Sequence, residues 1–336
     1  MIGVVIYCVA FIGFIILYEL HKHELKKAAI TQNNLLNSIT EPQSADIIGK
    51  TSDKRLPTIP NTKSFDNLKE EIRSLFHFSQ LHIIFGIDYT ASNEWHGRKS
   101  FNGQMLHKIH GNKIYNPYQK VISQLGSLVE DIFSIVKYYC FGFGDQDTKN
   151  FAVFPIIGSG EEIVKHQYLQ TTKTISLSGP TCYAPIISKL IDSAVRNMQA
   201  FMMLIIVADS SVDLNDILMI STLQTLSNIS NACVVLIGIG DGPWHEMAKI
   251  EHRIRELCLK SPTMAAITNK KEQNPLSSTN SVIYDNFHFV DYNKIANAHQ
   301  RTNIAMDKEL AKAVFKKFIT QLKQTRLKFQ QQGQVE

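Results

Sequence analysis

The sequence from residue 81 to residue 93 reads Leu81-His-Ile-Ile-Phe-Gly-Ile-Asp88-Tyr-Thr90-Ala-Ser92-Asn93, an apolar run that ends at an acid and is followed by two hydroxyls. A continuous run of β-branched and aromatic residues is typical of a buried strand in a parallel sheet. Open α/β sheets bind ligands at the carboxyl ends of their strands. We therefore expect Asp88, Thr90 and Ser92 to lie at the binding edge of such a sheet.

These three side chains form a candidate metal site. One carboxylate and two hydroxyl oxygens suit a hard cation such as Mg²⁺, but they cannot complete its octahedron. Two other stretches offer the missing oxygens: Thr181 precedes a predicted helix at 183–198, and a second apolar run, 201–209, ends at Asp209. The alternative is that these residues are ordinary helix caps, because Asp, Thr and Ser are common at that position and short motifs often match by chance.

Strands and helices alternate along the rest of the chain. This alternation predicts a doubly wound, mostly parallel α/β sheet with right-handed crossovers. The expected strands are 81–88, 138–142, 201–209, 232–240 and 286–290, and the expected helices are 66–78, one that begins at Asn116-Pro117 with apolar positions up to Ile135, 183–198, 213–230 and 310–327.

The N-terminus contains a candidate membrane anchor. Ile2 to Tyr18 is uninterrupted by charge and is followed by basic residues around Lys22, so we predict a single transmembrane helix at 2–20 with the bulk of the chain in the cytoplasm. A cleaved signal peptide and a buried core helix are the alternatives. Residues 21–64 are predicted to be a polar flexible linker, 65–328 the folded domain and 329–336 a polar tail.

Composition narrows the class of protein. The net charge of +5 over 336 residues gives no broad nucleic-acid signal. The five cysteines are odd in number and have no metal-ligand spacing, which fits a reducing compartment. No nucleophile motif is present, so we expect no enzyme.

Two histidines and a row of cations have alternative interpretations. A zinc site at His107 and His110 has no third ligand nearby in the sequence, which favours a polar surface role. The C-terminal cations form either a solvated helix face or a contact with an anionic membrane leaflet. They are Lys312, Lys316, Lys317, Lys323, Arg326 and Lys328.

Several motifs in a fixed order give the chain a family resemblance. It resembles the copine type of von Willebrand factor A domain, especially the copine domain of the plant RING-domain ubiquitin ligases. The motifs that carry the resemblance are Gly86–Trp95, Gly97–Phe101, Asn116–Tyr118, Phe141–Asp145, Gly179–Thr181, Ala184–Ile187, Gly240–Trp244 and Tyr284–Phe287.

The resemblance implies a metal-ion-dependent adhesion site made of Asp88, Thr90, Ser92, Thr181 and Asp209. It further implies that Mg²⁺ or Mn²⁺ binds there and that a protein partner supplies an acidic residue to the metal. The chain departs from the family at Ser210, where the family has Gly; we expect the added side chain to perturb the loop slightly. Because the sequence has no Cys/His array after Cys258 and little room before residue 65, we expect neither a RING nor C2 domains.

The function expected from this resemblance is that of a membrane-tethered, cytoplasmic, metal-dependent protein-binding adaptor. Two alternatives remain. One is a substrate-recruiting or regulatory relative of RING-type ubiquitin ligases that lacks its own RING and is linked to the ubiquitin machinery. The other is a structural anchor whose metal site is occluded, which is favoured if Ser210 distorts the loop.

Overall fold

The structure is a computed structural model that describes residues 62–110, 114–156, 161–260, 283–298 and 303–332. The chain divides into two compact units, Met1–Thr58 and Ile59–Glu336, and every described residue belongs to the second. Its elements in chain order are α2 (Thr62–Leu75), β1 (Gln80–Asp88), η1 (Ala91–Glu94), α3 (Pro117–Ile132), β2 (Val136–Phe143), β3 (Phe154–Pro155), α4 (Glu161–Thr172), α5 (Ala184–Arg196), β4 (Ala200–Ala208), α6 (Ile217–Leu226), β5 (Ala232–Gly238), η2 (His245–Lys249), α7 (Ile250–Leu259), β6 (Phe287–Asp291), α9 (Tyr292–Ala298) and α10 (Asn303–Gln332).

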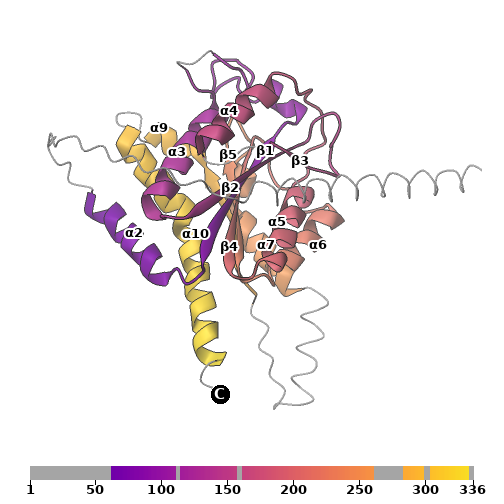
Figure 1. Ribbon diagram of the computed structural model, residues 1–336. Coiled ribbons are helices and arrows are strands. Elements are labelled where there is room, and N and C mark those ends of the chain that lie inside the picture. Colours follow the sequence, from indigo (N-terminus) through magenta and orange to yellow (C-terminus); the bar gives the residue numbers. More distant parts are fainter. Residues whose placement is uncertain (1–61, 111–113, 157–160, 261–282, 299–302, 333–336) are drawn as a thin grey trace, which may run out of the picture. The chain divides into compact units, whose positions relative to one another are not determined.

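A six-stranded sheet in the order β3-β2-β1-β4-β5-β6 forms the centre of the domain (Figure 1). All neighbouring strands pair in parallel except β3, which pairs with β2 in antiparallel orientation. The register aligns Leu81 with Val136 of β2 and Phe201 of β4. The mostly parallel α/β fold predicted from the sequence is therefore confirmed.

The sheet is covered on both faces, which explains the continuous apolar runs. Successive side chains of a strand point to opposite faces. In β4, Phe201 and Met203 join the core under α3 and α10, whereas Met202 and Leu204 join the core under α5, α6 and α7. Figure 1 shows these two groups of helices on opposite sides of the sheet. Because each face is dry, every residue of β4 and β5 is buried.

Several predicted boundaries differ from the observed ones. The helix expected at 213–230 spans only Ile217–Leu226, because the Asp216 side chain caps it by accepting from the backbone N–H of Leu218. Helix α3 ends at Ile132, so Ile135 is not one of its apolar positions and is 61% exposed. Helices α4, α7 and α9 and the two-residue β3 were not predicted. Helix α10 continues to Gln332, into the expected tail.

Three of the six predicted surface cations of the C-terminal helix bond to other parts of the domain: Lys317, Lys323 and Arg326. Lys317 lies 3.0 Å from Glu251 and also pairs with Asp285. Lys312 pairs with Glu309, and Lys323 pairs with Glu71 of α2. Lys317 is therefore not part of a solvated helix face. To bind Lys317 or Lys323, an anionic membrane would have to displace carboxylates of the domain with which these lysines already pair.

The predicted anchor at 2–20 and residues 21–61 of the predicted linker lie outside the described residues. Within the described ranges, no helix has the length and apolar character needed to cross a bilayer. Helix α2 begins at Thr62, three residues before the predicted start of the domain. The anchor remains a prediction from the sequence.

Candidate functional site

Two acids end the two central strands on the same edge of the sheet. Asp88 is the last residue of β1, and Asp209 directly follows β4. Because β1 and β4 are parallel neighbours in register, their carboxyl ends bring both acids together. Both residues are fully buried. The sequence-based pairing of Asp88 with Asp209, 121 positions apart in the chain, thus has the geometry expected of it.

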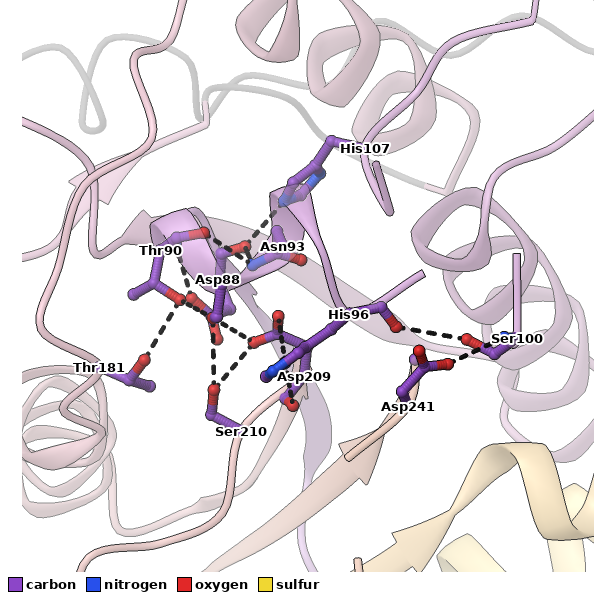
Figure 2. Close-up of polar contacts among 12 residues, drawn as sticks. Asp88, Thr90, Asn93, His96, Ser100, His107, Thr181, Asp209, Ser210 and Asp241 are labelled. Carbon is purple, nitrogen blue, oxygen red and sulfur yellow. Dashed lines mark hydrogen bonds and ion pairs between the residues drawn. The ribbon is translucent and has the colours of Figure 1, made fainter. Parts of the chain in front are cut away.

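Three hydroxyls connect these acids in one network. The backbone N–H of Thr90 donates to Oδ1 of Asp88 at 2.8 Å, and the hydroxyls of Thr90 and Ser92 lie 3.0 Å apart. Ser92 donates to Oδ1 of Asp209 at 2.9 Å, and the Thr181 hydroxyl donates to that of Thr90 at 3.2 Å. Figure 2 shows Thr90, Thr181, Asp209 and Ser210 gathered around Asp88. All five predicted site residues therefore lie together.

One oxygen of each carboxylate lacks a hydrogen bond. Oδ2 of Asp88 and Oδ2 of Asp209 are buried and accept none. Nδ1 of His96 lies 3.0 Å from Oδ2 of Asp209 and 3.2 Å from the Asp209 carbonyl, and the Asp209 side chain raises the pKa of His96 against the opposing effect of burial. Burial raises the pKa of Asp88 well above its usual value, and the neighbouring charge of Asp209 raises it further.

Three buried side chains, those of Asn93, His107 and Tyr118, donate hydrogen bonds to the backbone carbonyl of Asp88. Nε2 of His107 donates to the Asp88 carbonyl at 2.8 Å, and Asn93 donates to the same oxygen at 3.2 Å. Tyr118 shares its hydroxyl proton between this carbonyl, at 3.0 Å, and Oδ1 of Asn93, at 2.7 Å. These bonds fix the peptide from which the Asp88 carboxylate projects.

His107 is a core residue, so the predicted surface role for it is wrong. Its ring stacks between Tyr89 and Tyr118 at centroid distances of 4.7 and 4.0 Å. Burial lowers its pKa to about 4, so the ring is neutral. Since Nε2 carries the proton, Nδ1 accepts from the Tyr168 hydroxyl at 2.9 Å. Among the described residues, no group of three or more His, Cys, Asp or Glu side chains is placed to hold a metal, which excludes a zinc cluster at His107 there.

Gly144, in the loop after β2, makes room for the hydroxyl loop. Its φ of +83° lies in the left-handed region, which disfavours side chains. A Cβ at this position would lie 2.4 Å from Cγ2 of Thr90. Gly144 therefore permits the close approach that places Thr90 beside Asp88, a role that the sequence motif alone did not reveal.

Ser210 does not distort the loop in the way expected from the family difference. It is not among the described residues with positive φ, so this backbone does not require glycine. Its hydroxyl donates to Oδ1 of Asp209 at 3.0 Å and lies 3.4 Å from that of Ser92. The Tyr183 hydroxyl donates to its carbonyl at 2.6 Å. Ser210 adds a hydroxyl to the network.

His96 is a residue of the site that sequence reasoning missed. The side chain of His96 contacts Asp209. The backbone carbonyl of His96 accepts a hydrogen bond from the backbone N–H of Asp241 at 2.7 Å. The Asp241 carboxylate in turn accepts the backbone N–H groups of Lys99 and Ser100 (Figure 2). The signal for His96 in the sequence was only its place four residues after Ser92.

The donor set fits a divalent cation. Two buried carboxylate oxygens without hydrogen bonds and the hydroxyls of Thr90, Ser92 and Thr181 are hard oxygen donors of the kind that Mg²⁺ and Mn²⁺ prefer. Two neighbouring buried carboxylates with only His96 beside them are costly without a further cation. Metal binding itself remains a prediction.

The sheet order, with acids and hydroxyls at the ends of its central strands, defines an A-type α/β domain. Residues 105–332 match the copine family. This match covers more than half of the chain, which therefore belongs to the copine family.

Two curated relatives illustrate the match. Copine family protein 1 of Caenorhabditis elegans is 32% identical over 69% of this chain and 19% of its own length. The E3 ubiquitin-protein ligase RGLG3 of Arabidopsis thaliana is 33% identical over 70% of this chain, which spans only 62% of the ligase. A solved structure of manganese-loaded Plasmodium vivax TRAP protein matches 65% of this chain and 71% of its own chain, with 16% identity and a TM-score of 0.34. Membership of the family rests on the sequence match rather than on that structure.

Proposed function

We propose that this domain is a divalent-metal-dependent protein-binding module of the copine type. The single observation that carries the proposal is the pair of buried carboxylate oxygens, Oδ2 of Asp88 and Oδ2 of Asp209, that accept no hydrogen bond beside three linked hydroxyls. A bound Mg²⁺ or Mn²⁺ would supply positive charge there and an open position for a carboxylate of the partner. Thr90, Ser92 and Thr181 would contact the metal, and the two acids would hold it directly or through water.

Thiol chemistry is not favoured among the described residues. The four described cysteines are buried and unpaired, and burial raises the pKa of each thiol, so none is a ready nucleophile. The proposal also includes a single transmembrane anchor at 2–20, with the domain facing the cytoplasm. It is supported by the apolar run from Ile2 to Tyr18 and the basic residues after it.

The test is direct metal binding by the full chain. Mn²⁺ binding is measured by electron paramagnetic resonance, with Mg²⁺ as competitor, for the parent and for Asp88→Ala. Asp192→Ala, on the exposed side of α5, is the matched control. We expect the control to bind as the parent does and Asp88→Ala to lose binding; equal binding by all three would disprove the site.

Partner binding is tested with the same variants. Each is used as bait in Mg²⁺ and in chelator, and captured proteins are quantified by mass spectrometry. We expect a set of proteins that requires both the metal and Asp88. A captured set that is the same with and without chelator would contradict metal dependence.

A second candidate function is substrate recruitment for ubiquitin ligation, favoured by the 33% identity to RGLG3. We infer that the domain has no ligase activity of its own and acts by binding. Ubiquitin-chain formation by the purified chain with E1 and E2 enzymes would contradict this inference. Recruitment would instead be seen as metal-dependent capture of a protein whose ubiquitination falls in Asp88→Ala.

A further inference from the structure

A groove of about 810 Å³ lies next to the candidate metal site, at the same edge of the sheet. Its walls come from the loop after β1, the first turns of α3, the loop after β5, and α9 with the start of α10. Gly240 and Asp241 follow β5, and Asp291 ends β6, so the groove opens at the carboxyl ends of these two strands. This is where open α/β sheets bind ligands.

Three lysines from three separate elements line this groove: Lys99, Lys120 and Lys294. All three are exposed, and none forms an ion pair with another described residue. The N-terminus of α3, where Pro117 lies in the groove wall, adds the positive end of a helix dipole.

The three acids of the groove wall are already used by the domain. Asp241 accepts the backbone N–H groups of Lys99 and Ser100, which outweigh the effect of burial and lower its pKa. Asp291 accepts the backbone N–H of Lys294 at 3.0 Å, and Asp307 accepts from the Gln124 side chain at 2.7 Å. The three acids balance the formal charge of the three lysines, but the acids are half-buried and hydrogen-bonded, whereas the lysines are exposed, so the groups within reach of an acidic chain are the ammonium groups.

The hydrogen bonds of His96 connect the groove wall to the candidate metal site. The His96 carbonyl accepts from the backbone N–H of Asp241, while Nδ1 of His96 donates to the Asp209 carbonyl. Asp241 holds the 99–100 turn that carries the first groove lysine. A segment bound at the metal site can thus continue past His96 into the groove.

We propose that this groove binds an acidic, extended segment of the same protein partner whose carboxylate reaches the metal site. The proposal rests on the proposed function for the choice of a protein as the partner. Exposed lysines spaced along an open groove suit a chain with several carboxylates better than a compact ligand. The rings of Tyr115 and Trp244, also in the groove wall, offer apolar contacts between the charges.

The experiment uses the full chain and a fluorescein-labelled peptide of alternating Glu and Gly, with a Gln-Gly peptide as its uncharged counterpart. Binding is measured by fluorescence anisotropy at low ionic strength, in Mg²⁺ and in chelator. The test variant is Lys99→Gln/Lys120→Gln/Lys294→Gln. The control, Lys137→Gln/Lys173→Gln/Lys316→Gln, removes the same charge from exposed lysines outside the groove. Circular dichroism checks the fold of both variants.

We expect the Glu-Gly peptide to bind the groove variant about tenfold more weakly than the parent, because three exposed charge pairs contribute roughly that factor. The control and the Gln-Gly peptide report non-specific attraction. Parent-like binding by the groove variant, or an equal loss in the control, overturns the proposal. Phosphatidylserine vesicles that bind in a lysine-dependent way while the peptide does not would also overturn it, because the groove would then be a membrane contact.

The two proposals fail differently. If Asp88→Ala removes only the Mg²⁺-dependent part of peptide binding, and the groove variant removes the part that persists in chelator, both stand. If Mg²⁺ never changes binding but the groove lysines still matter, the metal-dependent function fails and the acidic-segment groove remains.

Discussion

Two clusters of carboxylates in this domain contrast in how their charge is compensated. At the ends of β1 and β4, Asp88 and Asp209 are fully buried and meet only hydroxyls, backbone N–H groups and the edge of His96. Between α7, β6 and α10, Glu251 and Asp285 share Lys317, and His288 contacts Glu251 at 2.5 Å.

The difference distinguishes the candidate binding site from a cluster that is structural. Nδ1 of His288 contacts Glu251, and Nε2 of His288 lies 2.9 Å from the Ala313 carbonyl. The second cluster is complete within the domain and ties α10 to the sheet. Among the described residues, the first has no lysine or arginine partner and only the edge of His96 beside Asp209, and for this reason we propose that a cation from outside binds there.

The largest effect expected from this contrast is on metal-dependent stability. Mg²⁺ at a hundredfold excess over its dissociation constant should stabilise the parent by about 2.7 kcal/mol. Asp88→Ala should remove this increment, because the buried oxygens would no longer hold the cation. Thermal unfolding followed by circular dichroism, with Mg²⁺ or chelator, measures it. Asp192→Ala should keep the increment, and its loss there would mean that the effect is not specific to the site.

The second prediction concerns the self-contained cluster, that is, Glu251, Asp285, His288 and Lys317. Lys317→Met should lower the free energy of unfolding by about 2 kcal/mol, since it leaves Glu251 and Asp285 partly buried without their shared cation. Urea denaturation measures the change, which should be the same in Mg²⁺ and in chelator. Lys316→Met, at the exposed neighbour, is the control and should change stability little. A metal-sensitive loss in Lys317→Met would contradict the independence of the two clusters.

The third prediction concerns the support behind the metal site. His107→Phe keeps an aromatic ring between Tyr89 and Tyr118 but removes the bond to the Asp88 carbonyl. We expect Mn²⁺ affinity to fall about tenfold, the effect typical of lost outer-shell contacts. His82→Phe replaces another buried histidine, at the start of β1, and should leave Mn²⁺ affinity unchanged. Unchanged affinity in His107→Phe would show that packing alone positions Asp88.

The smallest effect is the pH dependence of the self-contained cluster. Burial by itself would raise the pKa of Glu251, but His288 and Lys317 outweigh it and lower this pKa to about 2. A lowered folded-state pKa contributes stability above the unfolded value of about 4.5, and this stability is lost as the pH falls toward 2. Glu251→Gln should therefore differ from the parent by less than about 1 kcal/mol near pH 6, because the group is partly exposed. The difference should shrink between pH 4.5 and 2 in urea titrations, and a constant difference would assign it to packing instead.

Much of the candidate site could be predicted from the sequence, because strand formation and the turn after Asp88 depend on residues that are close together in the chain. Apolar runs that end in Asp88 and Asp209 predict neighbouring buried strands, and acids at the ends of parallel neighbours share an edge. The hydroxyls of Thr90 and Ser92 follow Asp88 in one turn, so their grouping was visible as well. Thr181 was proposed as a further oxygen because it precedes the helix predicted at 183–198, and the family resemblance then assigned it to the same site.

The elements missed by sequence reasoning have weaker local patterns. Helix α9 has only seven residues and α7 ten, and β3 has two residues, so few turns or pairs repeat for a period to be recognised. The predicted extension of α3 to Ile135 failed because periodic apolar spacing does not mark where a helix ends. That end depends on the following turn into β2.

The sequence by itself thus determined the parallel sheet, the edge at which the acids meet and the family to which the chain belongs. Only the tertiary structure decided which charges are compensated. It buried His107 under the metal site, paired Lys317 of the C-terminal row within the domain, and brought Lys99, Lys120 and Lys294 together in one groove. The physical reason is that strand and helix formation depend on neighbours in the chain, whereas desolvation and charge compensation depend on neighbours in space.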